Sequence, residues 1–178
     1  LGGTMAGARV LELGCGRGVG TEILRKTFGA QTVHALDLDP AMIRLAAARL
    51  RPALGTEVLV SISDAAQLPV PTASMDVVLD SAIIHHIPAW DLAVAEVARV
   101  LRPGGRFFFV EVTRHALERW SYRTFFDHPR ERRFGRADFV AALAQHGIVV
   151  GDRVVERFFG DFLLGVGYRQ PHAAERAR

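Results

Sequence analysis

The chain has 178 residues, of which 49% are hydrophobic and 23% charged, and its formal net charge is +3. This composition excludes a disordered protein, and the length fits a single domain spanning residues 1–178. No apolar run approaches the ~20 residues of a membrane-spanning helix and no signal peptide is visible, so we expect no membrane partner. Cys15 is the only cysteine, which excludes an internal disulfide and favours a cytoplasmic location.

Strand-like and helix-like segments alternate along the chain. Short β-rich runs predict strands at residues 9–13, 32–36, 57–62, 75–79 and 106–112. Helical spacing predicts helices at residues 20–28, 40–50, 92–101 and 136–145. The first of these should bury Ile23, Leu24 and Phe28, and the second should begin with Asp39 as its cap and Pro40 in its first turn.

Two further strand-like segments, residues 149–158 and 161–170, are separated only by a turn around Gly160. A turn this short requires antiparallel pairing. We therefore predict an α/β fold: a doubly wound, Rossmann-like and mostly parallel seven-stranded sheet with an antiparallel late strand and helices on both faces.

The stretch V10-L11-E12-L13-G14-C15-G16-R17-G18-V19-G20 places glycines directly after the first predicted strand. In a doubly wound sheet the ligand lies beyond the carboxyl ends of the strands, where glycines let the backbone approach it closely. A tight turn without a ligand is the alternative, although one glycine would suffice for it. The G-x-G-x-x-G spacing of dinucleotide-binding loops fails, because its third glycine would fall on Val19 or Thr21.

The spacing that does occur is E-x-G-x-G-x-G, formed by Glu12, Gly14, Gly16 and Gly18. It is followed in order by A-L-D-L-D-P, S-D-A-A-Q-L-P, M-D-V-V-L-D-S-A-I-I-H-H-I and L-R-P-G-G-R-F-F-F. From about residue 10 to residue 109 this series resembles the class I S-adenosylmethionine-dependent methyltransferases. The resemblance implies S-adenosylmethionine as cofactor and S-adenosylhomocysteine as product.

The resemblance also implies roles for individual residues. Asp37 would accept hydrogen bonds from both ribose hydroxyls, with Leu38 beside the adenine. Asp64 would take the exocyclic amine of the adenine, and the backbone amide of Ala65 a ring nitrogen. The backbone around Asp80 would face the methionine end of the cofactor.

Glu12 would either orient the glycine loop or reach the amino group of the cofactor through water. His85 and His86 follow the fourth predicted strand. Adjacent side chains point in different directions, so the pair does not predict a metal site. We expect His85 to face the pocket and accept a proton from the substrate. The alternative is that the pair only begins a helix.

Residues 114–136 contain seven arginines and three acids, interleaved with aromatic residues. We interpret this segment as a substrate-recognition or lid insertion for an anionic or aromatic substrate. The alternative is an amphipathic helix with solvated arginines. Nucleic acid is disfavoured as a partner, because the rest of the chain is not basic enough. Closure over the cofactor would otherwise come from a second copy of the chain, as a homodimer, or from a segment before Leu1.

The predicted function is transfer of a methyl group from S-adenosylmethionine to a small-molecule acceptor by in-line displacement. Two alternatives stay open at this point. One is a nicotinamide-dependent oxidoreductase on a similar sheet. The other is a non-catalytic subunit that binds S-adenosylmethionine.

Overall fold

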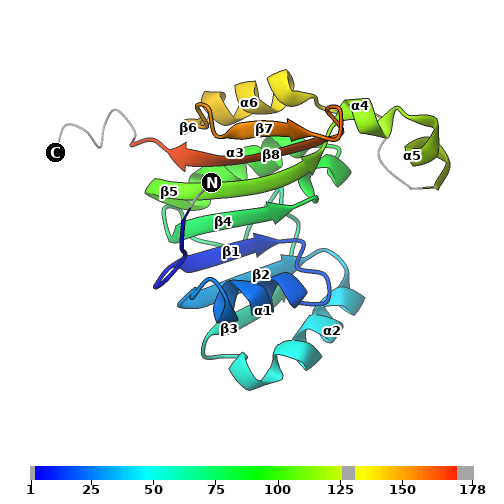
Figure 1. The fold of residues 1–178 in the computed structure, drawn as a ribbon. Helices are drawn as coiled ribbons and strands as arrows, with labels where there is room; N and C mark the ends of the chain where they lie inside the picture. The colour runs from blue at the N-terminus through cyan, green and yellow to red at the C-terminus, as the bar shows by residue number, and fades with distance from the viewer. Residues whose placement is uncertain (1–2, 126–130, 172–178) are drawn as a thin grey trace.

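A computed structural model of the chain describes residues 3–125 and 131–171 and contains one mixed sheet (Figure 1). Within the described residues the sheet has eight strands in the order β3-β2-β1-β4-β5-β8-β6, and β7 also pairs with β8. The strands are β1 (Arg9–Leu13), β2 (Thr32–Asp37), β3 (Val58–Ile62), β4 (Met75–Ser81), β5 (Leu101–Val112), β6 (Ile148–Val149), β7 (Val154–Arg157) and β8 (Phe162–Arg169).

The first five strands are parallel, whereas β6 and β7 each pair antiparallel with β8, and β8 antiparallel with β5. This confirms the mostly parallel, Rossmann-like α/β fold with an antiparallel end. The strand expected at residues 149–158 is divided into two. A turn at Gly151, which has a φ of 53°, and the bond from Arg153 N to Val150 O separate β6 from β7.

The helices are α1 (Val19–Lys26), α2 (Pro40–Leu50), α3 (Trp90–Val100), α4 (Arg114–Leu117), α5 (Trp120–Phe125) and α6 (Arg136–Gln145), with short 3-10 turns η1 (Arg51–Ala53) and η2 (Ile84–His86). Asp39 caps α2 as expected, because its Oδ1 accepts from Ala41 N at 2.7 Å. In Figure 1, α1 lies in front of the sheet and α3 behind it, as in a doubly wound fold. None of the helices among the described residues is long and apolar enough to cross a membrane.

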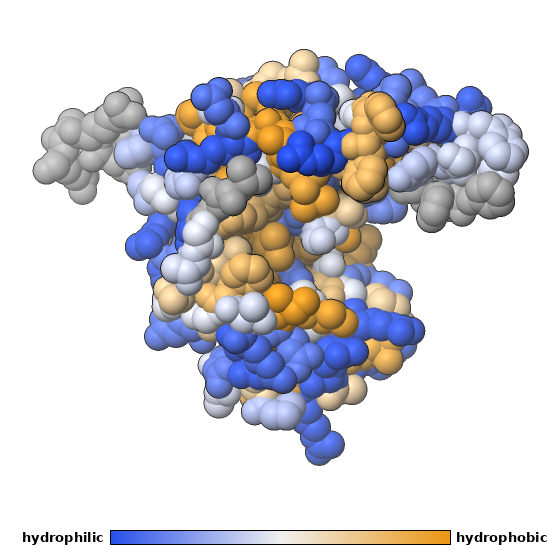
Figure 2. All heavy atoms as spheres, viewed as in Figure 1, coloured by the Kyte–Doolittle hydropathy of each residue, from blue (hydrophilic) through white to orange (hydrophobic). Residues whose placement is uncertain are grey.

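The largest hydrophobic cluster packs α3 and α6 against β4 and β5, and its aromatic centre includes Phe107, Phe109 and Phe139. The apolar face predicted for the first helix is only partly right. Leu24 is buried, whereas Ile23 is more than 40% exposed, and Phe28, similarly exposed, lies beyond the end of α1 at Lys26. Figure 2 shows apolar residues gathered in the middle of the face that carries α1.

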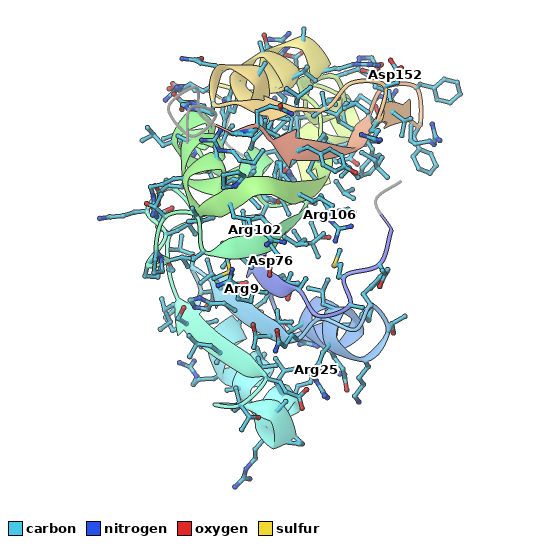
Figure 3. The ribbon with its side chains drawn as sticks, turned by 90° about the vertical axis from the view of Figure 1, so that its left-hand side faces the viewer. Arg9, Arg25, Asp76, Arg102, Arg106 and Asp152 are labelled. Carbon is cyan, nitrogen blue, oxygen red and sulfur yellow. The ribbon has the colours of Figure 1, made fainter. Side chains whose placement is uncertain are left out.

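An ion-pair cluster ties the strands together at the amino edge of the sheet. Asp76 on β4 lies between Arg9 on β1 and Arg102 on β5 (Figure 3). Its Oδ2 accepts from Arg9 N at 2.6 Å, and its Oδ1 lies 2.7 Å from Arg102 Nε. These contacts connect β1, β4 and β5 at their amino ends. The loops at the opposite, carboxyl edge of the sheet take no part in this cluster.

Candidate active site

The strand order reverses between β1 and β4, since β2 and β3 follow on one side of β1 and β5 on the other side of β4. At such a switch point the two loops beyond the carboxyl ends diverge and leave room for a ligand. Here the loop after β1 contains Gly14, and the loop after β4 contains Ile83. A Cβ added to Gly14 would lie 2.2 Å from the Ile83 side chain, so the two loops are packed together at their base.

Three glycines of the loop adopt backbone angles that other residues avoid: φ is 64° at Gly14, 53° at Gly16 and 77° at Gly18. A Cβ on Gly16 would meet nothing within 4 Å, in contrast to Gly14 and Gly18. The loop is therefore packed at both ends and open in its middle. This is the arrangement that lets a backbone approach a bound molecule.

Glu12 supports the loop from below. It is almost fully buried, and Thr21 Oγ1 donates to its Oε2 at 2.5 Å. A Cβ on Gly20 would lie 2.0 Å from Glu12 Oε1, so the first turn of α1 can reach the carboxyl group only because residue 20 is glycine. Burial raises the pKa of Glu12 to about 7. Glu12 thus contacts the first turn of α1 beneath the loop, and its role toward the cofactor stays a prediction.

Asp37 joins the end of β2 to the glycine loop. Its Oδ2 accepts from Gly16 N at 2.8 Å and its Oδ1 from Asp39 N at 2.9 Å. Each carboxylate oxygen has capacity for a further donor, so the half-buried group can also take two hydroxyls. The next residue, Leu38, is 69% exposed and presents an apolar surface beside the loop.

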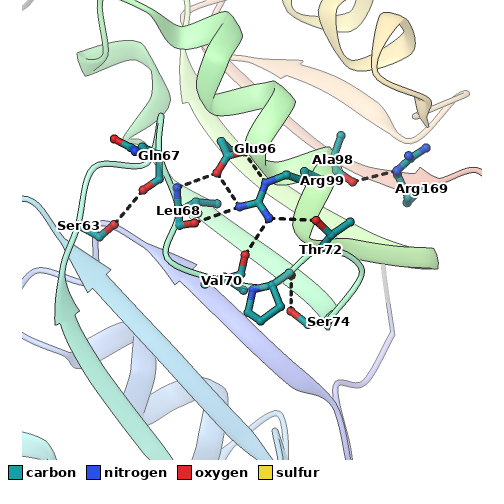
Figure 4. Close-up of polar contacts among 11 residues, drawn as sticks. Ser63, Gln67, Leu68, Val70, Thr72, Ser74, Glu96, Ala98, Arg99 and Arg169 are labelled. Carbon is teal, nitrogen blue, oxygen red and sulfur yellow. Dashed lines mark hydrogen bonds and ion pairs between the residues drawn. The ribbon is translucent and has the colours of Figure 1, made fainter.

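Asp64 and Ala65 lie in the loop after β3. Asp64 is exposed, and its Oδ1 accepts from Ala66 N at 2.8 Å in a tight turn, while Ala65 packs against the main core. The loop leading on to β4 is held by Arg99 of α3 (Figure 4). The Arg99 guanidinium donates to Val70 O at 2.8 Å and Leu68 O at 3.0 Å.

The sequence alone does not predict this function of Arg99. Glu96, one turn earlier on α3, accepts from Arg99 Nε at 2.5 Å and from Leu68 N at 2.7 Å. An acid and a base at i and i+3 are visible in the sequence, but their loop partners lie about 30 positions away. Glu96 and Arg99 together fix the conformation of the loop before β4, which has no regular secondary structure.

A buried polar cluster lies behind the loop after β4. Glu111 on β5 is fully buried and accepts from Ile84 N at 2.7 Å and His85 N at 3.2 Å. Its Oε2 also lies 2.5 Å from His85 Nδ1. Asp80, equally buried, accepts from Ile83 N at 3.1 Å. Burial raises the pKa of both carboxyl groups, and the neighbouring Glu111 raises the pKa of Asp80 further.

This cluster determines how the two histidines lie. The His85 side chain is 3% exposed and engaged by Glu111, and burial lowers its pKa to about 4. His86 is exposed. The proton-accepting role of His85 therefore stays a prediction, and in this structure its ring contacts Glu111. The Asp80 carboxyl group also points inward, which leaves only its backbone for the ligand contact that the resemblance implies.

The residues at this edge fit an adenosine-containing cofactor. The backbone at Gly16 is open on its Cβ side, and the Asp37 carboxylate lies next to it. The exposed side chain of Leu38 suits the face of a base, and Asp64 offers a second carboxylate after the neighbouring strand. The loops supply no phosphate-binding spacing, which agrees with a cofactor that has no pyrophosphate.

Comparison with known proteins decides the family. A methyltransferase-domain family matches residues 11–109, which include the glycine loop, Asp37, Asp64 and both histidines. The chain belongs to the class I S-adenosylmethionine-dependent methyltransferases. This confirms the resemblance on which the cofactor assignment depends.

Two curated methyltransferases illustrate the relationship. The chain is 39% identical over 132 residues to a fatty-acid O-methyltransferase of Mycolicibacterium smegmatis, covering 74% of this chain and 47% of that protein. It is 38% identical over 109 residues to a phthiotriol/phenolphthiotriol dimycocerosates methyltransferase of Mycobacterium tuberculosis, covering 61% of this chain and 39% of that protein. The chain thus spans about half the length, or less, of these relatives.

Among solved structures, an S-adenosylmethionine-dependent methyltransferase from Mesorhizobium loti shares the fold. The TM-score is 0.76 at 22% identity, covering 93% of this chain and 92% of that one. The shared fold extends beyond the sequence match into the antiparallel carboxyl-terminal strands. The late antiparallel strands therefore belong to the fold that the two proteins share.

Proposed function

We propose that this methyltransferase transfers the methyl group of S-adenosylmethionine to a small-molecule acceptor of the lipid class. One observation supports S-adenosylmethionine as the cofactor. Gly16 N donates a hydrogen bond to Asp37 Oδ2, and the backbone at Gly16 is open to a ligand. The acceptor class rests on the two curated relatives, whose names specify a fatty acid and a dimycocerosate lipid.

When bound, the sulfonium of the cofactor supplies an activated methyl group, so the chain need not generate an electrophile of its own. The residues of the chain act by binding and orientation. Asp37 and the loop amides hold the nucleoside end, and Glu111 fixes the turn at Ile84 and His85 that borders the other end. Holding two reactants in line accounts for a large part of the rate in such transfers.

Two parts of the assignment rest on the sequence alone. We propose that α4 and α5, within residues 114–136, border the acceptor side; residues 126–130 of that segment lie outside the described part of the chain. His85 as a proton acceptor is likewise a proposal. A carboxylate acceptor, as in a fatty acid, is already ionised near neutral pH and would need no base.

Replacing Asp37 by alanine tests the cofactor site, with Asp39→Ala as the matched control. The two carboxylates lie two residues apart, but Asp39 caps α2 through Ala41 N, whereas Asp37 faces the loop. Calorimetric titration with S-adenosylmethionine should show affinity lost in Asp37→Ala and within about threefold of the original in Asp39→Ala. Undiminished binding by Asp37→Ala would contradict the assignment.

The two alternatives are separated by direct measurements. Binding of NADH, followed by its fluorescence, should be absent, because the loop lacks the dinucleotide spacing. Incubation with labelled cofactor and a medium-chain fatty acid should give a methyl ester. Cofactor binding without any methylated product across lipid acceptors would favour the non-catalytic subunit.

A further inference from the structure

The turn between β7 and β8 is the place among the described residues where two adjacent non-glycine residues have positive φ angles. Gly160 N donates to Arg157 O at 3.2 Å, which closes a four-residue turn. The two central residues, Phe158 and Phe159, have φ angles of 52° and 59°. Positive φ at both central positions is typical of a type I′ turn, whose central residues are usually Asn and Gly. Gly160, with a φ of 91°, continues the left-handed run, so four residues connect Arg157 to its strand partner Phe162.

Two phenylalanines at these positions contradict ordinary turn chemistry. Bulky residues are rarely found in the left-handed region because Cβ crowds the backbone there. Burial does not compensate for this strain, since Phe158 is 71% exposed and Phe159 94% exposed. A strained, exposed and hydrophobic pair is explained better by an external contact than by the folding of this domain.

The turn is held firmly in this strained form. The Phe158 ring packs edge-on against Phe162 with their centroids 5.6 Å apart. Thr113, at the end of β5, donates from its hydroxyl to Gly160 O at 2.5 Å and from its backbone to Asp161 O at 2.9 Å. Phe159 is therefore presented on a fixed support that is anchored to the central sheet.

Basic side chains surround the turn. Arg119 Nη1 lies 3.0 Å from Asp161 Oδ2, which brings the α4–α5 corner against the turn, and the following residue, Trp120, is 74% exposed. A cavity of about 470 Å³ beside Phe159 is lined by Arg114, His115 and Arg136, and by two acids, Glu118 and Glu156. Across residues 113–125, 131–136 and 154–162 the sequence has seven arginines and four acids. Four of these arginines form ion pairs yet keep exposed side chains: Arg114 with Asp138, Arg119 with Asp161, Arg132 with Asp91 and Arg136 with Glu156.

We propose that this turn is a membrane-docking tip, with Phe158 and Phe159 entering the headgroup boundary of an anionic lipid bilayer. Exposed aromatic side chains prefer that boundary, and the surrounding arginines can bind lipid phosphates while their stems cover apolar surface. A second copy of the chain fits less well, because a convex tip of two side chains falls far short of the ~800 Å² per partner of a stable interface.

The position of the tip relates membrane docking to the proposed active site. β8 begins where β5 ends, since Phe162 pairs with Val112, so the tip lies at the carboxyl edge of the sheet. The glycine loop and Asp37 lie at the same edge. Docking there would present the site to acceptors held in the bilayer. The sequence predicts no membrane partner, and a contact of this kind needs no spanning segment.

The test measures co-sedimentation of the purified chain with phosphatidylcholine vesicles, with and without about one third phosphatidylglycerol. The double variant Phe158→Asn and Phe159→Gly installs the residues that the turn prefers. We expect it to melt at the same or a higher temperature than the parent chain and to bind S-adenosylmethionine equally well. Its partitioning onto anionic vesicles should fall about tenfold or more.

Leu45→Gln on α2 is the control, because it removes an exposed leucine (44%) from the opposite end of the sheet. It should bind vesicles like the parent chain, and added salt should weaken binding in both. The proposal is overturned if the parent chain does not prefer anionic vesicles, or if the double variant binds them equally well. A parent dimer that becomes monomeric in the double variant, with neither binding vesicles, would overturn it in favour of self-association. None of these outcomes depends on methyl transfer.

Discussion

Replacing Glu111 by alanine tests the buried cluster behind the loop after β4. The side chain is fully buried, and it accepts hydrogen bonds from the backbone amides of Ile84 and His85 and contacts the His85 ring. Truncation leaves these buried groups without their acceptor. It also removes the carboxyl group beside Asp80, which relieves part of the repulsion between the two acids.

The magnitude follows from these contacts. Breaking a buried, hydrogen-bonded polar cluster by removing one partner costs about 3 to 5 kcal/mol. Relief of the repulsion at Asp80 returns about 1 kcal/mol, so the net loss is about 3 kcal/mol. For a domain of this size that corresponds to a fall in Tm of about 6 to 12 °C.

Differential scanning calorimetry measures the shift, and Glu57→Ala is the control. Glu57 also pairs with a base, Arg25, at 2.7 Å, but its side chain is 49% exposed. The control should change the free energy of unfolding by less than about 1 kcal/mol. Affinity for S-adenosylmethionine should fall in Glu111→Ala, because the turn bordering the site loses its support. A Tm within about 2 °C of the parent would refute the reasoning.

Three further predictions concern the glycine loop. Gly14→Ala places a Cβ within 2.2 Å of the Ile83 side chain at a residue with positive φ, so urea unfolding should show a loss of about 2 to 4 kcal/mol in stability. Gly16→Ala meets no such neighbour, so it should lower cofactor affinity with a smaller loss of stability. Because the pKa of Glu12 is about 7 in the fold and 4.5 otherwise, its protonated form is favoured on folding, and stability should decline by about 3 kcal/mol as pH rises from about 4.5 to 7. Thermal melts of Glu12→Gln should lack this decline, and an unchanged pH profile would contradict the shifted pKa. Burial, together with Glu12 and Asp37, raises the pKa of Cys15 to about 12, so a maleimide should label the thiol only after unfolding.

Features that depend on local sequence could be predicted without the structure. The alternation of strands and helices follows from hydrophobic period, the cap of α2 from Asp39 and Pro40, and the ligand edge from the glycines after β1. Asp37 could be placed because it ends a strand next to that loop. Each of these inferences needs only residues a few positions apart, or the regular geometry of a parallel sheet.

Features that depend on residues far apart in the sequence could not be predicted. Glu111 contacts His85 across 26 positions, and nothing in F-F-F-V-E-V marks its carboxyl group as the acceptor for another loop. The position of the His85 ring is a consequence of that contact. The division of residues 149–158 does have a local signal, because Gly151 and Asp152 are typical turn residues, but the valines on both sides favour one continuous strand. The turn around Gly160 is predicted, but the left-handed backbone of Phe158 and Phe159 is not, since their residue type argues against it.

The reversed direction of β8 has a consequence for how this domain can diversify. The family match ends at residue 109, near the end of β5, and β8 then returns along β5. The carboxyl-terminal third could therefore be exchanged as one block between homologues, provided that the graft brings its own return strand to cover β5. Such chimeras would keep the amino-terminal part, which contains the predicted cofactor site, and would exchange the carboxyl-terminal part of the domain surface.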